Sequence, residues 1–267
     1  MTCFPLAISG GQSLVVKVQA ARPWKRAPAA PGLDSSVYNS YSATKSGSRD
    51  GNAVSTPIES SDVLPLFPTF IWKSQLSAAV HRPIGEQLGT VLGELCRDEP
   101  ARGQSWQSAH DLHERSELTG LLDCVNQATH AALQSVRIRE QRFEVTGCWL
   151  NVYAPGAAHP LHNHPNNYLS GVYYAQVQPG ADTINFHDPR AQTGVIRPPV
   201  TELVAANADQ AVVGVREGTL LLFPAWLPHS VDANASDRRR ISVSFNIMFT
   251  AYAETMGRPM WDPGVRS

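Results

Sequence analysis

The sequence has 267 residues, 42% of them hydrophobic and 17% charged, and a formal net charge of −1 at pH 7. That length allows one large domain with a substantial core and a tail beside it. The even charge balance excludes the strongly basic surface that phosphate-rich partners usually require. We therefore expect no nucleic-acid partner and instead a small-molecule or peptide substrate.

The four cysteines, at positions 3, 96, 124 and 148, form no CxxC pair and have no regular spacing. This argues against a zinc knuckle, a redox dithiol or a disulfide framework, and it fits a reducing intracellular compartment. No apolar run approaches the roughly 20 residues that cross a bilayer, so we expect a soluble protein without a membrane partner. A homodimer stays open as the assembly state.

Residues 1–60 are rich in Ser, Ala, Gly and Pro, with four basic residues between positions 17 and 26 and no acidic residue before Asp34. This profile predicts a disordered leader and also resembles an organellar transit peptide. A non-functional extension is the equal alternative. We expect the folded domain at residues 61–255, followed by a C-terminal tail at 256–267.

The first ordered segment is expected at residues 63–72, an apolar stretch that is interrupted by prolines and is typical of an edge strand. Two helical patterns follow, around residues 83–96 and 114–135. In the second, Leu118, Leu121 and Val125 recur at helical spacing. These helices should pack on the outside of a sheet.

From residue 143 onward the pattern changes to short β-rich runs separated by Pro, Gly, Asn and Asp. The runs cover residues 143–153, 169–177, 183–187, 211–215, 219–223 and 240–249. Many short strands after a helical segment predict a mainly β domain, a sandwich or barrel with flanking helices, rather than a parallel α/β sheet.

Three of the nine histidines, His159, His162 and His164, fall within six residues. On a regular strand His162 and His164 point to one face and His159 to the other, so two imidazoles can share one metal ion. Imidazole suits Fe, Zn, Cu and Ni, and a site that activates oxygen or substrate keeps coordination positions open. A third, distant ligand is therefore expected. His229 is the candidate, because the apolar run 218–223 leads there through a proline-rich turn.

An isolated HxH pair is more often a surface or core pair than a metal site. The context here favours the metal site. The order of features along the chain matches a whole barrel. A glycine turn, the HxH pair and an apolar strand at 169–174 come first, and a second glycine, strand, proline turn and histidine follow later.

The segments around Gly156 and the HxH pair, and around Gly218, Pro224 and His229, resemble the two signature motifs of the cupin superfamily. A closer resemblance is to a 2-oxoglutarate/Fe(II) oxygenase family. Its patterns HxHPNxxLSGVYY, FxDPR, GxLLLFPxWLxHxV and RxSxSFN stand here at residues 162–174, 186–190, 218–231 and 240–246. The resemblance covers roughly residues 63–250 and implies a double-stranded β-helix, a jelly-roll or cupin-like barrel, with its core at about 143–250.

In related prolyl-hydroxylase-like enzymes an HxD or HxE motif and a distal histidine hold Fe(II), and a basic residue about ten positions later binds the far carboxylate of 2-oxoglutarate. His162 and His229 match this scheme. His164 takes the carboxylate position, so the resemblance implies a site of three neutral ligands. One negative charge less leaves Fe(II) more electrophilic and strengthens its attraction for an anionic co-substrate. Three-histidine iron sites also serve dioxygenases whose substrate chelates the metal directly.

Arg240 begins an alternating strand on which its side chain shares one face with those of Ser242, Ser244 and Asn246. In a ligand-holding barrel that face would line the cavity. A guanidinium binds a carboxylate through two parallel hydrogen bonds, and Ser242 would add a third. The alternative is a solvated loop cluster of arginines with an external polar face.

The resemblance places Tyr174 near the co-substrate, and Tyr153, beside the turn before the histidines, is a second candidate for this role. The alternative for both is a packed aromatic ring with its hydroxyl at the surface. We expect residues 188–190 to form a structural turn in which the arginine pairs with a carboxylate. The alternative is that Asp188 supplies a carboxylate ligand to the metal. Trp149 and Asn151 flank the cavity strand and are candidates for substrate contact.

The sequence therefore predicts a non-haem Fe(II) dioxygenase that uses O2 and 2-oxoglutarate to hydroxylate or otherwise oxidise a small molecule or a peptide side chain. The predicted metal ligands and catalytic centre are His162, His164 and His229, and the residues predicted to bind the co-substrate are Arg240, Ser242, Tyr174 and Tyr153. Two alternatives stay open. One is a three-histidine cupin-type dioxygenase or isomerase that holds Fe, Ni or Zn and needs no 2-oxoglutarate, and the other is a non-catalytic barrel that binds a small ligand.

Overall fold

The computed structural model describes residues 17–18, 60–62, 66–139, 142–191, 195–196 and 198–253. Residues 22–68 form one unit, whose described residues contain neither helix nor strand, and residues 1–21 and 69–267 form the other. Of the leader predicted at 1–60, the described residues are Lys17–Val18, which form strand β1, and position 60. The rest of the leader and the whole tail at 256–267 lie outside the described residues, so both stay predictions.

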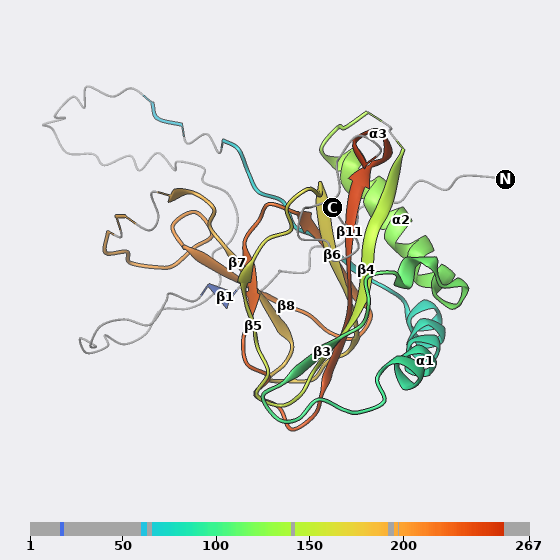
Figure 1. Ribbon diagram of the computed structural model, residues 1–267. Helices are drawn as coiled ribbons and strands as arrows, with labels where there is room; N and C mark the ends of the chain where they lie inside the picture. The colour runs from blue at the N-terminus through green and yellow to red at the C-terminus, as the bar shows by residue number, and fades with distance from the viewer. Residues whose placement is uncertain are drawn as a thin grey trace, which may run out of the picture. The chain divides into compact units, whose positions relative to one another are not determined.

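The larger unit is built around two antiparallel sheets (Figure 1). The six-stranded sheet has the order β2-β9-β6-β11-β4-β3, and the five-stranded sheet has the order β1-β8-β7-β10-β5. The first contains β2 (Trp72–Gln75), β3 (Ser105–Gln107), β4 (Phe143–Tyr153), β6 (Leu169–Gln176), β9 (Thr219–Pro224) and β11 (Arg240–Phe249). The second contains, besides β1, the strands β5 (His159–His162), β7 (Thr183–His187), β8 (Gln210–Gly214) and β10 (His229–Val231).

Consecutive strands cross between the two sheets from β4 to β7 and again from β8 to β11. This alternation winds the chain around the space between the sheets, as in a jelly roll. The predicted fold class, mainly β with flanking helices, is confirmed. Three predicted strands, 143–153, 183–187 and 240–249, have the bounds that the structure shows. The other three differ by one residue at one or both ends.

The helices α1 (Ala78–Leu95) and α2 (Thr119–Ser135) cover the outer face of the six-stranded sheet (Figure 1). The first begins five residues earlier than expected, because Pro83, which suggested its start, lies inside the helix. Burial of Ile84 and Leu88 against the sheet stabilises the helix despite the hydrogen bond that proline removes.

The second predicted helix begins with two short 3-10 turns, η1 (Leu112–Glu114) and η2 (Ser116–Leu118), before α2. A four-residue helix, α3 (Thr250–Ala253), follows β11. None of the helices among the described residues is both long and apolar enough to span a membrane.

The edge strand predicted at residues 63–72 is partly wrong. Residues 66–71 of this stretch form no strand, and Leu66 and Phe67 are exposed. Strand pairing begins at Trp72, where β2 forms the edge of the six-stranded sheet. The physical reason is that prolines at 65 and 68 have no N–H for the sheet. Residues 63–65 lie outside the described part.

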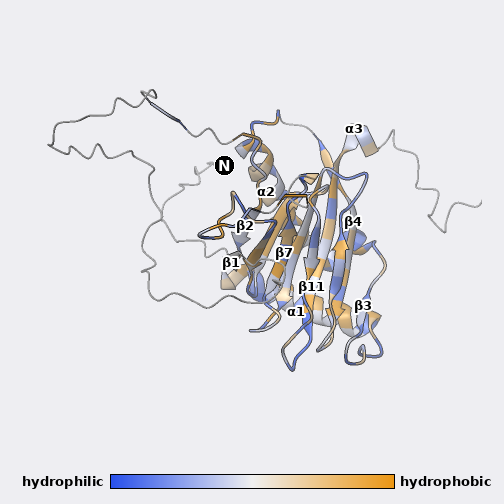
Figure 2. Ribbon diagram, turned by 90° about the vertical axis from the view of Figure 1, so that its left-hand side faces the viewer, coloured by the Kyte–Doolittle hydropathy of each residue, from blue (hydrophilic) through white to orange (hydrophobic). Residues whose placement is uncertain are grey.

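Side chains along β4 and β11 point alternately to the hydrophobic core on one face of the sheet and to the candidate site on the other. On β11, Ile241, Val243 and Phe245 pack toward the helices, whereas the polar residues between them face the other sheet. Figure 2 shows the corresponding bands of hydrophobic and hydrophilic residues along these strands. A second apolar cluster, which includes Phe186 and Phe223, fills part of the space between the sheets. The remainder of that space is a polar cavity.

Candidate metal centre

Strands β5 and β10 place His162 and His229 directly opposite each other in an antiparallel pair. Cross-strand neighbours share a face, and the centroids of these two imidazole rings are 4.2 Å apart. His164 follows the end of β5, where its backbone N–H donates to the Ala225 carbonyl at 2.9 Å. One nitrogen from each of the three histidines lies within 4.8 Å of the other two. The structure thus brings together the three ligands predicted from the sequence, and metal binding by them stays a prediction.

Backbone carbonyls orient two of these rings. The Nδ1 atom of His162 lies 2.9 Å from the Pro160 carbonyl oxygen, and that of His229 lies 2.9 Å from the Leu227 carbonyl oxygen. A carbonyl oxygen only accepts, so each Nδ1 carries the hydrogen and donates it. The lone pair is thereby left on Nε2, as in histidines whose orientation is fixed for metal binding.

Burial keeps His164 and His229 neutral. Burial first, and the neighbouring imidazoles to a smaller extent, lower the pKa of His229 to about 3 and that of His164 to about 4. At neutral pH both side chains therefore have a free lone pair. Three neutral nitrogen donors on one side of a cavity suit a first-row transition metal with open coordination positions.

The orientation predicted for His159 is wrong, because its ring lies on the same side as that of His162, with centroids 4.2 Å apart. The cause is a β-bulge: His229 pairs with His162 but Val231 pairs with His159, so β5 has one residue more than β10 between these pairs. An extra residue reverses the alternation of side chains. His159 thus lines the cavity, where its Nδ1 is 2.6 Å from the Tyr153 hydroxyl.

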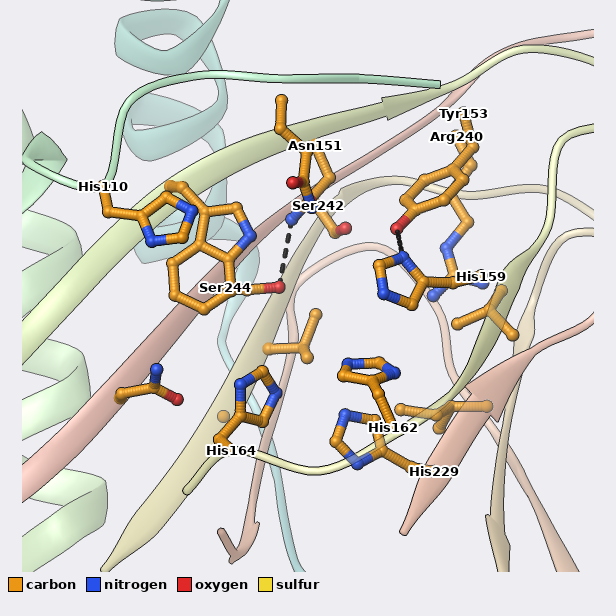
Figure 3. Close-up of a pocket in the computed structure, with 17 residues that line it drawn as sticks. His110, Asn151, Tyr153, His159, His162, His164, His229, Arg240, Ser242 and Ser244 are labelled. Atoms are coloured by element: carbon orange, nitrogen blue, oxygen red, sulfur yellow. Dashed lines mark hydrogen bonds between the residues drawn. The ribbon is translucent and has the colours of Figure 1, made fainter. Parts of the chain in front are cut away.

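The three histidines open onto a cavity of about 240 Å³ between the two sheets. As the sequence predicts, the polar face of β11 lines it along its whole length, from Arg240 through Ser242 and Ser244 to Asn246. Figure 3 shows Arg240 and Tyr153 together at one end of the cavity and His110 at the other. The volume lies below the range of about 300–1,000 Å³ that is typical of pockets for drug-sized ligands. It suits small groups rather than a polymer.

Arg240 is buried at 3% exposure, and the described residues supply no counter-charge to it. Its guanidinium donates to the Thr183 carbonyl at 2.9 Å and lies 5.0 Å from the centre of the Tyr174 ring. Its Nε atom has no hydrogen-bond partner, and no ion pair between described residues involves it. A buried cation in this state is costly unless an anion binds to it.

The remaining residues predicted to bind the co-substrate surround Arg240. Ser242 is buried and lines the cavity, and burial raises the pKa of Tyr153 to about 12, so its hydroxyl stays protonated. Tyr174 does not line the cavity but packs against the guanidinium, with its hydroxyl buried and unpartnered. Asp188 forms an ion pair with Arg190, as expected for a structural turn.

Among the polar lining residues, sequence reasoning missed Gln107 and His110, which come from β3 and the loop after it. The His110 ring stacks on the ring of Trp149, with centroids 4.2 Å apart and an interplanar angle of 18°. The Gln107 side-chain amide donates to Asn151 at 2.8 Å. Neither residue stands in a motif, and pairing of β3 with β4 brings them to the site.

Comparisons with known proteins agree with this architecture. Residues 147–246 match a family model described as "Putative 2OG-Fe(II) oxygenase", and a search of curated proteins finds no match. One similar structure is the non-heme alpha ketoglutarate dependent carbocyclase SnoK from nogalamycin biosynthesis, with TM-score 0.51 and 16% identity over 68% of this chain and 80% of that chain. Another is AviO1 from Streptomyces viridochromogenes Tue57, with TM-score 0.50 and 14% identity over 68% of this chain and 91% of that chain.

A prolyl-4-hydroxylase from Pseudomonas putida is also similar, with TM-score 0.46 and 19% identity over 68% of this chain and 93% of that chain. At identities of 14–16%, the likeness to SnoK and AviO1 shows the fold. The resemblance seen in the sequence is confirmed: the chain has the double-stranded β-helix fold of the 2OG-Fe(II) oxygenases, and its residues 147–246 match their family model.

Proposed function

We propose that this chain is a 2-oxoglutarate- and Fe(II)-dependent dioxygenase that hydroxylates or otherwise oxidises a small molecule or a peptide side chain. The observation that carries the proposal is the presence, in one cavity, of a three-histidine cluster and a buried guanidinium without a counter-charge. The first suits a transition metal, and the second suits a carboxylate.

The metal would be held by His162, His164 and His229 through the nitrogen atoms that face one another. Two of these rings are already oriented by backbone carbonyls, so little reorganisation is needed on binding. When bound, Fe(II) supplies the activation of O2 that couples decarboxylation of 2-oxoglutarate to succinate with oxidation of a substrate C–H bond. The protein residues bind and orient the reactants.

Arg240 would bind the far carboxylate of 2-oxoglutarate. Its unpartnered Nε and the neighbouring Ser242 hydroxyl can both donate to a carboxylate oxygen, and strong burial makes such charge-assisted hydrogen bonds more favourable. The Tyr153 hydroxyl, held by His159, closes this end of the cavity and limits the access of water. The same end contains no acidic side chain among the described lining residues that would compete for the guanidinium.

A three-histidine cupin-type enzyme that chelates its organic substrate directly is the second candidate. The specific observation in its favour is that the third side chain of the cluster is His164 instead of a carboxylate. In that enzyme Arg240 would bind part of the substrate or serve packing alone. The two candidates therefore differ in whether 2-oxoglutarate binds to the metal.

An anaerobic titration of the Fe(II)-loaded protein with 2-oxoglutarate tests the proposal. Chelation of the metal produces a weak visible metal-to-ligand charge-transfer band, which we expect for the wild type and not for Arg240→Ala at the same concentrations. Absence of the band in wild-type protein that demonstrably holds iron would reject the proposal and favour the second candidate.

A further inference from the structure

The two ends of the cavity differ in their access to solvent. At one end Arg240 and Tyr153 are buried, at 3% and 5% exposure. His110 lies at the other end (Figure 3), where both it and Gln107 are exposed lining residues. A substrate that arrives from solution therefore meets the His110 end first. If 2-oxoglutarate occupies the closed end, the open end is the place for the substrate.

One wall of the open end is aromatic. The His110 ring stacks on the Trp149 ring, and the Trp149 ring lies 5.9 Å from the ring of His164 at an interplanar angle of 53°. The three rings thus lead from the exposed end to the three-histidine cluster. Planar groups pack well beside such rings, because aromatic rings prefer stacked, offset and edge-to-face arrangements.

Hydrogen-bonding groups at the open end are arranged in a chain with two free positions. Gln107 donates to Asn151 at 2.8 Å, and Asn151 donates to the Ser244 hydroxyl oxygen at 3.0 Å. This leaves the Gln107 carbonyl oxygen as an acceptor and the Ser244 hydroxyl hydrogen as a donor. The acceptor and the donor lie at the two ends of this chain, with Asn151 between them. An amide both donates and accepts hydrogen bonds, so it can bind at either position.

The charge of the lining selects against ionised groups at the open end. Among the residues described around the cavity, none is Asp, Glu or Lys, and Arg240 is the one with a permanent charge. An ammonium or guanidinium group would lose its hydration here without gaining a counter-charge. A carboxylate would instead be attracted to Arg240 at the closed end.

We propose that the open end, formed by Gln107, His110, Trp149, Asn151 and Ser244, binds the substrate through an uncharged planar amide group and rejects cationic groups. This inference rests on the proposed function in one respect, because that function assigns the closed end to 2-oxoglutarate. It adds the class of substrate: a carboxamide or a peptide amide, in place of an amine, a guanidine or an acid.

Three probes of nearly identical shape test the inference: benzamide, benzamidine and benzoate. Their binding to the full chain is measured by saturation-transfer NMR, with and without 2-oxoglutarate, so no turnover is needed. We expect benzamide to bind in both conditions and benzamidine to bind at least about tenfold more weakly. We expect benzoate to be displaced by 2-oxoglutarate. Equal binding of benzamide and benzamidine overturns the inference, as does absence of benzamide binding up to about 10 mM.

Three variants locate the probes. Gln107→Leu removes the acceptor at the open end and should weaken benzamide about five- to tenfold. The exposed His130→Ala, outside the cavity, should leave benzamide binding unchanged, and Arg240→Met should abolish binding of benzoate. If the affinity for benzamide is the same in Gln107→Leu as in the wild type, the inference is overturned, provided that the variant keeps the circular dichroism and unfolding transition of the wild type.

The result also separates this inference from the proposed function. If 2-oxoglutarate fails to bind while benzamide binds in a Gln107-dependent way, the proposed function fails and the assignment of the open end stands. If 2-oxoglutarate binds at Arg240 but benzamidine binds as well as benzamide, the proposed function stands and the inference about the substrate fails.

Discussion

Replacement of Arg240 by methionine separates a binding role from a structural role. Methionine keeps much of the buried stem but removes the guanidinium. Among the described residues, the guanidinium is hydrogen-bonded to the Thr183 carbonyl and lies against the rings of Tyr153 and Tyr174. Loss of that hydrogen bond costs about 1–2 kcal/mol, and removal of an unpaired buried charge offsets it. We expect the free energy of unfolding to change by less than about 1 kcal/mol.

The effect on 2-oxoglutarate should be much larger. Removal of one partner from a buried, hydrogen-bonded charge pair costs about 3–5 kcal/mol, which corresponds to an affinity loss of at least about 100-fold. Isothermal titration calorimetry measures the affinity, and urea denaturation measures the stability. Arg238→Met is the matched control, since Arg238 is exposed two residues earlier. Unchanged affinity, or a loss of stability above about 3 kcal/mol, would refute the assigned role of Arg240.

Three further predictions follow from the site. His229→Ala should weaken Zn(II) or Fe(II) binding by at least about 100-fold in a chelator competition, while the exposed His130→Ala should not; equal losses would contradict the proposed ligand set. Burial lowers the pKa of folded His229 to about 3, so below about pH 6.5 the unfolded chain binds a proton that the folded chain does not. Stability of the metal-free protein should therefore fall between pH 6 and pH 4, by up to about 1.4 kcal/mol per pH unit for this histidine, and a flat profile in denaturant titrations would contradict this. Gly171→Ala would place a Cβ 2.3 Å from the Phe245 ring and 2.6 Å from the Leu221 carbonyl oxygen, and should lower the free energy of unfolding by about 3 kcal/mol; a neutral result would mean that the sheets pack differently.

The elements that sequence predicted well are those with a strong local pattern. Strand β11 alternates polar and apolar residues from Arg240 to Ile247, so the sequence predicts both the strand and the face that lines the cavity from Arg240 to Asn246. The HxH pair and His229 could be assigned to one metal site from the sequence, because the motifs around the pair and around His229 resemble those of a single barrel. Their mutual distance depends on the pairing of β5 with β10, which the sequence does not show.

The features that sequence reasoning missed depend on contacts between distant segments. The bulge in β5 reverses the orientation of His159, and it arises from pairing with β10 rather than from local residues. Gln107 reaches the cavity because β3 pairs with β4 opposite Asn151. Tyr174 was expected near the co-substrate, but the Arg240 guanidinium lies over its ring and the residue does not line the cavity. Such packing is decided by the sheet as a whole.

The most direct test of the central claim is whether the iron-loaded protein converts 2-oxoglutarate to succinate in an O2-dependent way. Mass spectrometry of reactions with isotopically labelled 2-oxoglutarate measures this even when the substrate is unidentified. The account predicts labelled succinate from the wild type under air, none under nitrogen, and none from His229→Ala or Arg240→Met. Folded, iron-loaded wild-type protein that leaves 2-oxoglutarate unbound and unconsumed, with amide-bearing substrates present, would contradict it.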